Sequence, residues 1–170
     1  MNSQHIDAIK SLFQSRLATL EHLLTLAQAH FQNDESFLQQ RLAADMFPFG
    51  TQIVFTCNQP RNFVLWCEGK PADNLDPQVT SIAQASEHIK NTRELLVSLS
   101  LDDEKLAEHT QIELGQNLYL ELSGHDYVNE FLIPNFYFHL VTAYDILRMA
   151  GVTIGKRDYM MHMGPFVRTR

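Results

Sequence analysis

Apolar residues recur at steps of three and four along most of this chain, which is the spacing of one face of an α-helix. The first such segment spans about residues 3–31, and Ser3 or Asp7 suits its start. Its recurring positions are Ile6, Ile9, Leu12, Phe13, Leu17, Leu20, Leu23, Leu24 and Ala27. The pattern predicts one long helix, then a break over residues 33–36 and a short helical turn up to residue 42.

A second helix is predicted over about residues 45–69. Asp45 is a favourable residue for capping its N-terminus, and Pro48 suits the first turn, where a missing N–H costs nothing. Pro60 lies inside the segment and predicts a kink. Gly69 is a typical residue for ending a helix.

The next stretch changes from helical to strand periodicity. After a polar loop over residues 71–77, a third helix is predicted over about residues 78–99, with a shorter one over residues 101–109. Residues 112–114 and 118–122 alternate between apolar and polar around a turn of glycine, glutamine and asparagine. This pattern predicts a small β-hairpin.

A fourth long helix is predicted over about residues 127–150, with Pro134 bending it or marking an early break and Gly151 ending it. Four long helices with apolar faces predict an all-α four-helix bundle, with the β-hairpin inserted before the last helix. The sequence has no internal repeat and no linker that would divide it, so residues 1–170 are expected to form one domain.

Charge and hydropathy exclude several partners. The net charge is −7, with 13 Lys and Arg against 20 acidic residues and no basic run. We therefore expect no binding to nucleic acid or to an anionic membrane surface. No uncharged apolar stretch is long enough for a membrane span, and the N-terminus does not resemble a secretory signal.

Cys57 and Cys67 lie ten residues apart on the second predicted helix, a separation of about 15 Å along its axis. A disulfide needs Cα atoms within about 7 Å of each other, so we expect two free thiols. Free thiols are typical of the reducing cytoplasm. The two cysteines do not form a C-x-x-C pair, so no redox or zinc motif is predicted from them.

Asn135 and His139 are the sharpest candidates for a functional site. They lie four residues apart on the strongly apolar fourth helix, so their side chains share one face. Two histidines at this spacing could coordinate a metal ion, but only one of this pair is a histidine. The two residues therefore have the spacing of a pair of metal ligands, but the set of ligands is incomplete.

Three stretches in register resemble a bacterial family of uncharacterised proteins within the DinB/YfiT-like helical bundles. They are Leu42-Ala43-Ala44-Asp45-Met46-Phe47-Pro48, Asn135-Phe136-Tyr137-Phe138-His139 and Gly155-Lys156-Arg157-Asp158. The resemblance covers nearly the whole chain and implies a DinB-like four-helix bundle.

The resemblance also implies a metal site, because DinB-like proteins commonly hold a metal with three histidines. One comes from the second helix and two, as H-x-x-x-H, from the fourth, where this chain has Asn135 and His139. Gln59 stands where related sequences have the second-helix histidine, and no histidine occurs between His30 and His88. One imidazole with amides is a poor site for zinc or nickel. We therefore expect a degenerate site, with no metal and no cofactor.

Each candidate also has a structural interpretation. His139 acts on a bound molecule or is a core histidine bonded to a neighbouring helix. Asn135 serves the same site or satisfies the carbonyl groups that Pro134 leaves unpaired. Asp45 caps the second helix or orients the ring of His139, and Arg157 lies in a solvated turn or faces an anionic ligand.

Two functions remain open from the sequence. The first is a bundle that binds a small molecule or a partner without metal catalysis, using a pocket lined by His139, Asn135, Asp45, Gln59 and Arg157. The second is an enzyme with an altered site, thiol-transferase-like or hydrolytic. DinB-like bundles are often dimers, and the tail after Gly155 is partly apolar. We therefore expect a symmetric homodimer.

Overall fold

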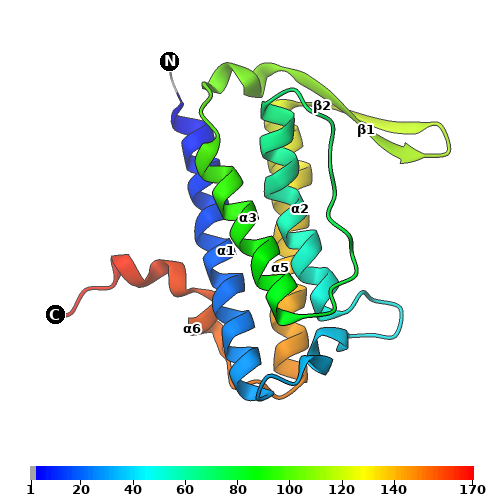
Figure 1. Cartoon of the computed structure of the whole chain (residues 1–170). Helices are drawn as coiled ribbons and strands as arrows, with labels where there is room; N and C mark the ends of the chain where they lie inside the picture. Colours follow the sequence, from blue (N-terminus) through cyan, green and yellow to red (C-terminus); the bar gives the residue numbers. More distant parts are fainter. Residues whose placement is uncertain (1–2) are drawn as a thin grey trace.

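Four long helices lie side by side in the computed structural model, which describes residues 3–170 (Figure 1). They are α1 (Gln4–His30), α2 (Phe49–Cys67), α3 (Ile82–Ser98) and α5 (Ile133–Met149). In the view of Figure 1, α1 and α5 run downward while α2 and α3 run upward. The predicted four-helix bundle is confirmed.

The core lies between these helices and is made of their apolar faces. α2 packs against α5 and α3, and α1 packs against α3. The ring of Phe13 on α1 packs against both α5 and α2. Its centroid lies 5.0 Å from that of Phe136 on α5 and 6.0 Å from that of Phe63 on α2. All three rings are fully buried. Fully burying such side chains stabilises the fold by about 1.5–3 kcal/mol each.

The start of α2 differs from the prediction. The helix begins at Phe49 with Pro48 as its N-cap, so the expected capping by Asp45 is wrong. The proline ring disfavours a helical conformation for the preceding residue, and the backbone N–H of Phe49 donates to Gln40 O at 2.8 Å. Asp45 therefore lies in an exposed turn before the helix. α2 then continues through Pro60 to Cys67.

Residues 68–81 connect the top of α2 to the bottom of α3 and lie along α2 (Figure 1). Asn58 Oδ1 accepts the N–H of Leu75 at 3.0 Å, and the Thr51 hydroxyl donates to Pro77 O at 2.9 Å. α3 then begins at Ile82, a few residues later than predicted, because the Ser81 hydroxyl accepts the N–H of Gln84 as a cap.

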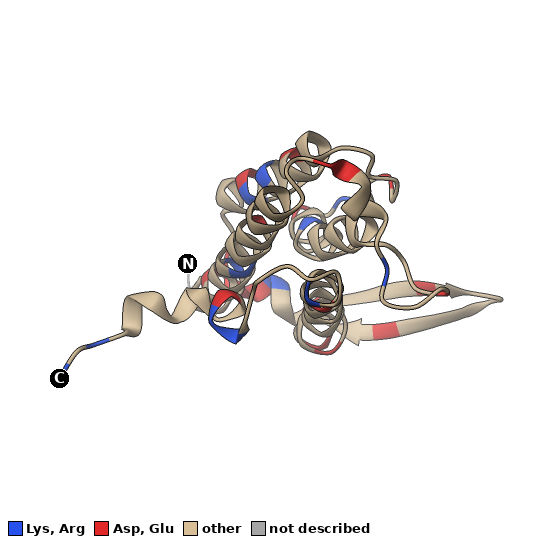
Figure 2. Ribbon diagram, turned by 90° about the horizontal axis from the view of Figure 1, so that it is seen from below, with Lys and Arg blue, Asp and Glu red and all other residues tan. Residues whose placement is uncertain are grey.

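The predicted hairpin is confirmed and extends from one end of the bundle (Figure 1). β1 (His109–Gly115) pairs antiparallel with β2 (Leu118–Ser123). Gln116 and Asn117 have positive φ values of 52° and 63°, as a tight hairpin turn requires. Both strands carry acidic positions (Figure 2). Short 3-10 helices, η1 (Glu35–Gln39) and η2 (Asp103–Ala107), complete the connections.

The last long helical segment is built from three parts. A single turn, α4 (Gly124–Asp126), leads into a π-helical stretch, η3 (Tyr127–Leu132), and α5 follows with Pro134 in its first turn. Gly151, with φ of 89°, ends α5. The short helices α6 (Lys156–Tyr159) and η4 (Met161–Phe166) then carry the C-terminal tail away from the bundle (Figure 1).

Two further expectations can be compared with the fold. Cys57 and Cys67 both lie on α2, and both are buried and free, as predicted. Burial raises the pKa of each thiol to about 12. Within residues 3–170, no helix is both long and apolar enough to cross a membrane.

Candidate functional site

His139 on α5 faces Gln52 on α2, across the contact between these two helices. The distance from His139 Nδ1 to Gln52 Oε1 is 2.8 Å, which is a hydrogen bond. Gln52 is only 2% exposed, whereas the histidine ring is half-buried. An amide among apolar neighbours near the start of α2 is therefore held by a specific partner, as buried polar groups generally are.

The hydrogen bonds of Gln52 fix the protonation of the histidine ring. The amide nitrogen of Gln52 donates to Phe47 O at 3.0 Å, so its oxygen faces His139. A carboxamide oxygen can only accept, and His139 Nδ1 must therefore carry the hydrogen. In a neutral imidazole the other nitrogen, Nε2, then keeps a free lone pair.

Three phenylalanine rings surround this polar pair. The centroid of the His139 ring lies 5.1 Å from that of Phe55 and 5.2 Å from that of Phe138, both edge to face. Phe47 in turn lies edge to face on Phe55 at 5.0 Å. Phe47 is 56% exposed and Phe138 58% exposed. We call this cluster of His139, Gln52, Phe47, Phe55 and Phe138 the His139 site.

The apolar surroundings keep the histidine uncharged. Burial lowers the pKa of His139 to about 4, because the charged form loses its hydration among the aromatic rings. At neutral pH the ring is therefore neutral. Its Nε2 can accept a hydrogen bond but is a weak proton acceptor.

Two of the other predicted residues lie on the helices that carry the site. Asn135 is one turn before His139 on α5, and its amide nitrogen donates to Phe131 O at 2.8 Å. The acceptor is the carbonyl four residues before Asn135, so this is a local bond within its own helical segment, and it does not reach the carbonyl of residue 130, which Pro134 leaves without its N–H donor. Gln59 lies two turns beyond Gln52 on α2, and its amide donates to Phe55 O of its own helix at 3.1 Å. Both side chains are half-buried.

The remaining two predicted residues lie elsewhere. Asp45 is exposed in the turn before α2, and the ring nitrogen it was expected to orient is bound by Gln52 instead. Arg157 lies on α6, which packs against α1. There it lines a cavity with His22 and the methionines of the tail, so the structure does not bring it to the His139 site.

The donors at the His139 site do not fit the three-histidine metal set that the family resemblance implies. The side chain of α2 that faces His139 is an amide, and its oxygen already accepts the ring N–H. Across residues 3–170, no three His, Cys, Asp or Glu side chains gather where they could hold a metal ion. Amide oxygens with one imidazole are a poor substitute for the nitrogen and sulfur donors that zinc prefers.

The four-helix fold, with its hairpin before the last helices, is that of a DinB-like helical bundle. A crystal structure of a DinB family member protein from Shewanella denitrificans is similar, with 31% identity over 89% of this chain and 88% of that chain and a TM-score of 0.77. Residues 6–160 match the family described as a domain of unknown function, DUF1993, and the chain belongs to that family. No curated protein matches it.

Sequence reasoning missed Gln52, which makes the one cross-helix hydrogen bond of the site. Gln52 lies between Phe49 and Ile53 in the apolar start of α2. A lone amide in such a run is a usable signal, because it needs a partner when the segment is buried. The same reasoning applies to His139, but it does not show which polar residue of α2 lies level with the ring.

Proposed function

We propose that the His139 site binds a small, neutral molecule that has an aromatic or aliphatic part beside a hydrogen-bond donor, without metal chemistry. The carrying observation is His139 Nε2, a lone pair kept unprotonated beside the exposed ring of Phe138. An O–H or N–H of a ligand would donate to this nitrogen. The apolar part would cover the rings of Phe47 and Phe138, as is common in small-molecule sites.

The alternative function, an enzyme with an altered site, would use the same nitrogen as a general base. An efficient general base has a pKa near the working pH. His139, with its pKa lowered to about 4, lies well below this range. The value favours binding over thiol transfer or hydrolysis.

A matched pair of probes tests the proposal. Phenol and anisole have the same ring, but only phenol has a hydroxyl donor. We expect phenol to shift the backbone amide signals of α5 around His139 in ¹H–¹⁵N spectra at lower concentrations than anisole does. His139→Asn is the matched variant, because its amide can still donate to Gln52 but has no counterpart of Nε2. In this variant phenol should bind no better than anisole.

Two results would count against the proposal. Equal binding of phenol and anisole to the wild type would show that the lone pair is not used. Turnover of p-nitrophenyl acetate or of a thiol-transfer substrate that disappears in His139→Ala would favour the enzymatic alternative.

We also propose a cytoplasmic location, which the two free and buried thiols support.

A further inference from the structure

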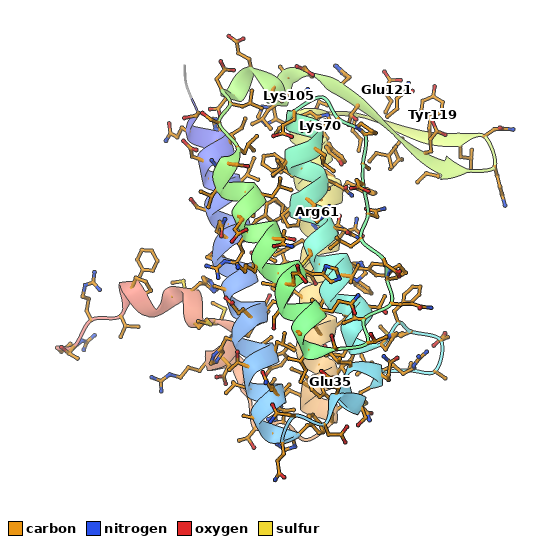
Figure 3. All side chains as sticks on the ribbon, in the orientation of Figure 1. Glu35, Arg61, Lys70, Lys105, Tyr119 and Glu121 are labelled. Carbon is orange, nitrogen blue, oxygen red and sulfur yellow. The ribbon has the colours of Figure 1, made fainter. Side chains whose placement is uncertain are left out.

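The cavity that Arg157 lines lies between α1 and the C-terminal tail, and its volume is about 470 Å³. The tail stands on the side of the bundle away from the hairpin, which the labels of Tyr119 and Glu121 mark in Figure 3. The lining residues come from α1 and the tail, so the cavity is separate from the His139 site between α2 and α5. Those that carry the argument are His22, Arg157, Asp158, Met160, Met161 and Met163.

A carboxylate orients the ring of His22 in this wall. His22 Nε2 lies 3.0 Å from Asp158 Oδ1. The other carboxylate oxygen, Oδ2, accepts the N–H of Gly155 at 2.8 Å, which holds the carboxylate at the start of α6. Because a carboxylate only accepts hydrogen bonds, Nε2 carries the hydrogen and Nδ1 of the neutral ring keeps its lone pair. Histidines that bind metals are commonly oriented by a carboxylate in this way.

The second ring nitrogen of His22, Nδ1, is uncommitted and can be reached from the cavity. Within residues 3–170, the one hydrogen bond of the ring is that of Nε2. The buried side-chain polar atoms without a partner, in the same residues, belong to Arg61, Asn62, His88 and His162, so His22 Nδ1 is not one of them. A ligand in the cavity therefore meets an accessible lone pair.

Methionine side chains form another part of the wall. Met163 N–H donates to Met160 O at 2.9 Å, which makes a 3-10 turn at the start of η4. Side chains three residues apart in such a turn are eclipsed, so Met160 and Met163 lie one above the other. Met161 and Met163 are exposed and Met160 is half-buried, so the core does not lock these side chains. The methionine side chain is flexible and its thioether is polarisable.

The donors and charges of the wall favour a soft, monovalent cation. Thioethers select Cu(I), and imidazole also binds copper. Arg157 repels a divalent cation about twice as strongly as a monovalent one. Asp158 is the one carboxylate among the described residues of the wall, and its oxygens already accept from His22 and Gly155. Hard cations, which need several oxygen ligands, would therefore find few here.

We propose that this cavity binds Cu(I), coordinated by His22 Nδ1 and by the thioether sulfurs of Met160 and Met163. Cu(I) is oxidised in air, so protein purified aerobically without added copper should not retain it. The inference does not depend on the function proposed for the His139 site.

The binding is tested with Cu(I) itself, supplied without oxygen as its acetonitrile complex and competed against the chromogenic chelator ferrozine. The chain has 6 methionines, and their ε-methyl ¹H–¹³C signals report on each sulfur separately. We expect one Cu(I) per chain, with shifts for Met160 and Met163 and none for Met46 and Met149. Zn(II) should shift none of these signals, because thioethers are soft ligands.

Three variants assign the ligands. His22→Gln keeps an amide that can donate to Asp158 but lacks the Nδ1 lone pair, and it should weaken Cu(I) binding by at least about tenfold, since even the loss of an outer partner of a ligand has this effect. The double variant Met160→Leu, Met163→Leu keeps the apolar volume without the sulfurs and should abolish binding. Met149→Leu, at the end of α5, is the matched control and should bind as the wild type does.

Failure of the wild type to take Cu(I) from ferrozine would overturn the proposal, and so would equal shifts of Met46 and Met149. Neither result requires a variant, so a variant that fails to fold does not protect the proposal. Unchanged affinity in His22→Gln, or binding that persists without Met160 and Met163, would place the copper elsewhere, for example on a cysteine, and would contradict the assignment.

Discussion

The half-buried, neutral ring of His139 should make the stability of this protein depend on pH in a defined direction. The pKa of His139 falls from 6.5 to about 4 on folding. Between these values the unfolded chain binds a proton on this ring and the folded chain does not. Stability therefore rises with pH in this window: the contribution is complete above about pH 6.5 and is lost as the pH falls toward 4.

The size of the effect follows from the shift. A fall in the pKa from 6.5 to about 4 corresponds to at most about 3.4 kcal/mol, and solvent at the exposed edge of the ring lowers the expectation to about 2 kcal/mol. His139→Asn is the reference, because its amide can donate to Gln52 but cannot titrate. All other ionisable groups are shared by the two proteins, so their effects cancel in the difference.

Urea unfolding followed by far-ultraviolet circular dichroism, at fixed protein concentration, measures this difference between pH 7 and pH 4. The wild type should lose about 2 kcal/mol more than His139→Asn over this range. If the two proteins lose the same free energy of unfolding between pH 7 and pH 4, to within about 0.5 kcal/mol, the lowered pKa of His139 is refuted.

Three further predictions concern the packing at Gly124, the metal content and the oligomeric state. Gly124→Ala should destabilise the fold by about 1–3 kcal/mol, because its Cβ would lie 2.8 Å from Leu106 O. The control, Gly164→Ala, has open space around it and should change stability by less than about 0.5 kcal/mol. Equal melting temperatures for the two variants would contradict the close packing at Gly124. Untagged protein should contain well under one transition metal ion per chain by elemental analysis. Stoichiometric zinc or nickel that is lost in His139→Ala would contradict the expectation that the metal site is degenerate. We propose a symmetric dimer through the tail, where Phe166 is 70% and Val167 71% exposed; sedimentation should show a dimer at tens of micromolar that Phe166→Ser weakens, and a monomeric wild type would count against it.

The bundle could be predicted from the sequence because its signal is local. Long runs with a period of 3.6 residues give the helices, and alternation around Gly115 gives the hairpin. The start of α2 could not be placed, since Asp45 is as good a cap as many true ones. It was the pairing of Phe49 N–H with Gln40 O, a contact outside the helix, that set the boundary.

The site was predictable only in part, for a geometric reason. Gln52 and Gln59 are two turns apart, so periodicity places both on one face of α2 but does not say which lies level with His139. That level is set by how α2 and α5 pack. The position of Arg157 likewise depends on the docking of α6 on α1, where His22 Nε2 lies 3.0 Å from Asp158 Oδ1.

The protonation of the His139 ring is the most direct test of the proposed binding site. Long-range ¹H–¹⁵N spectra of the imidazole distinguish a protonated nitrogen from one with a free lone pair. At pH 7 we predict hydrogen on Nδ1 and a free Nε2, with no titration until the pH approaches 4. A ring with its hydrogen on Nε2, or one that titrates near pH 6.5, would contradict this account of the site.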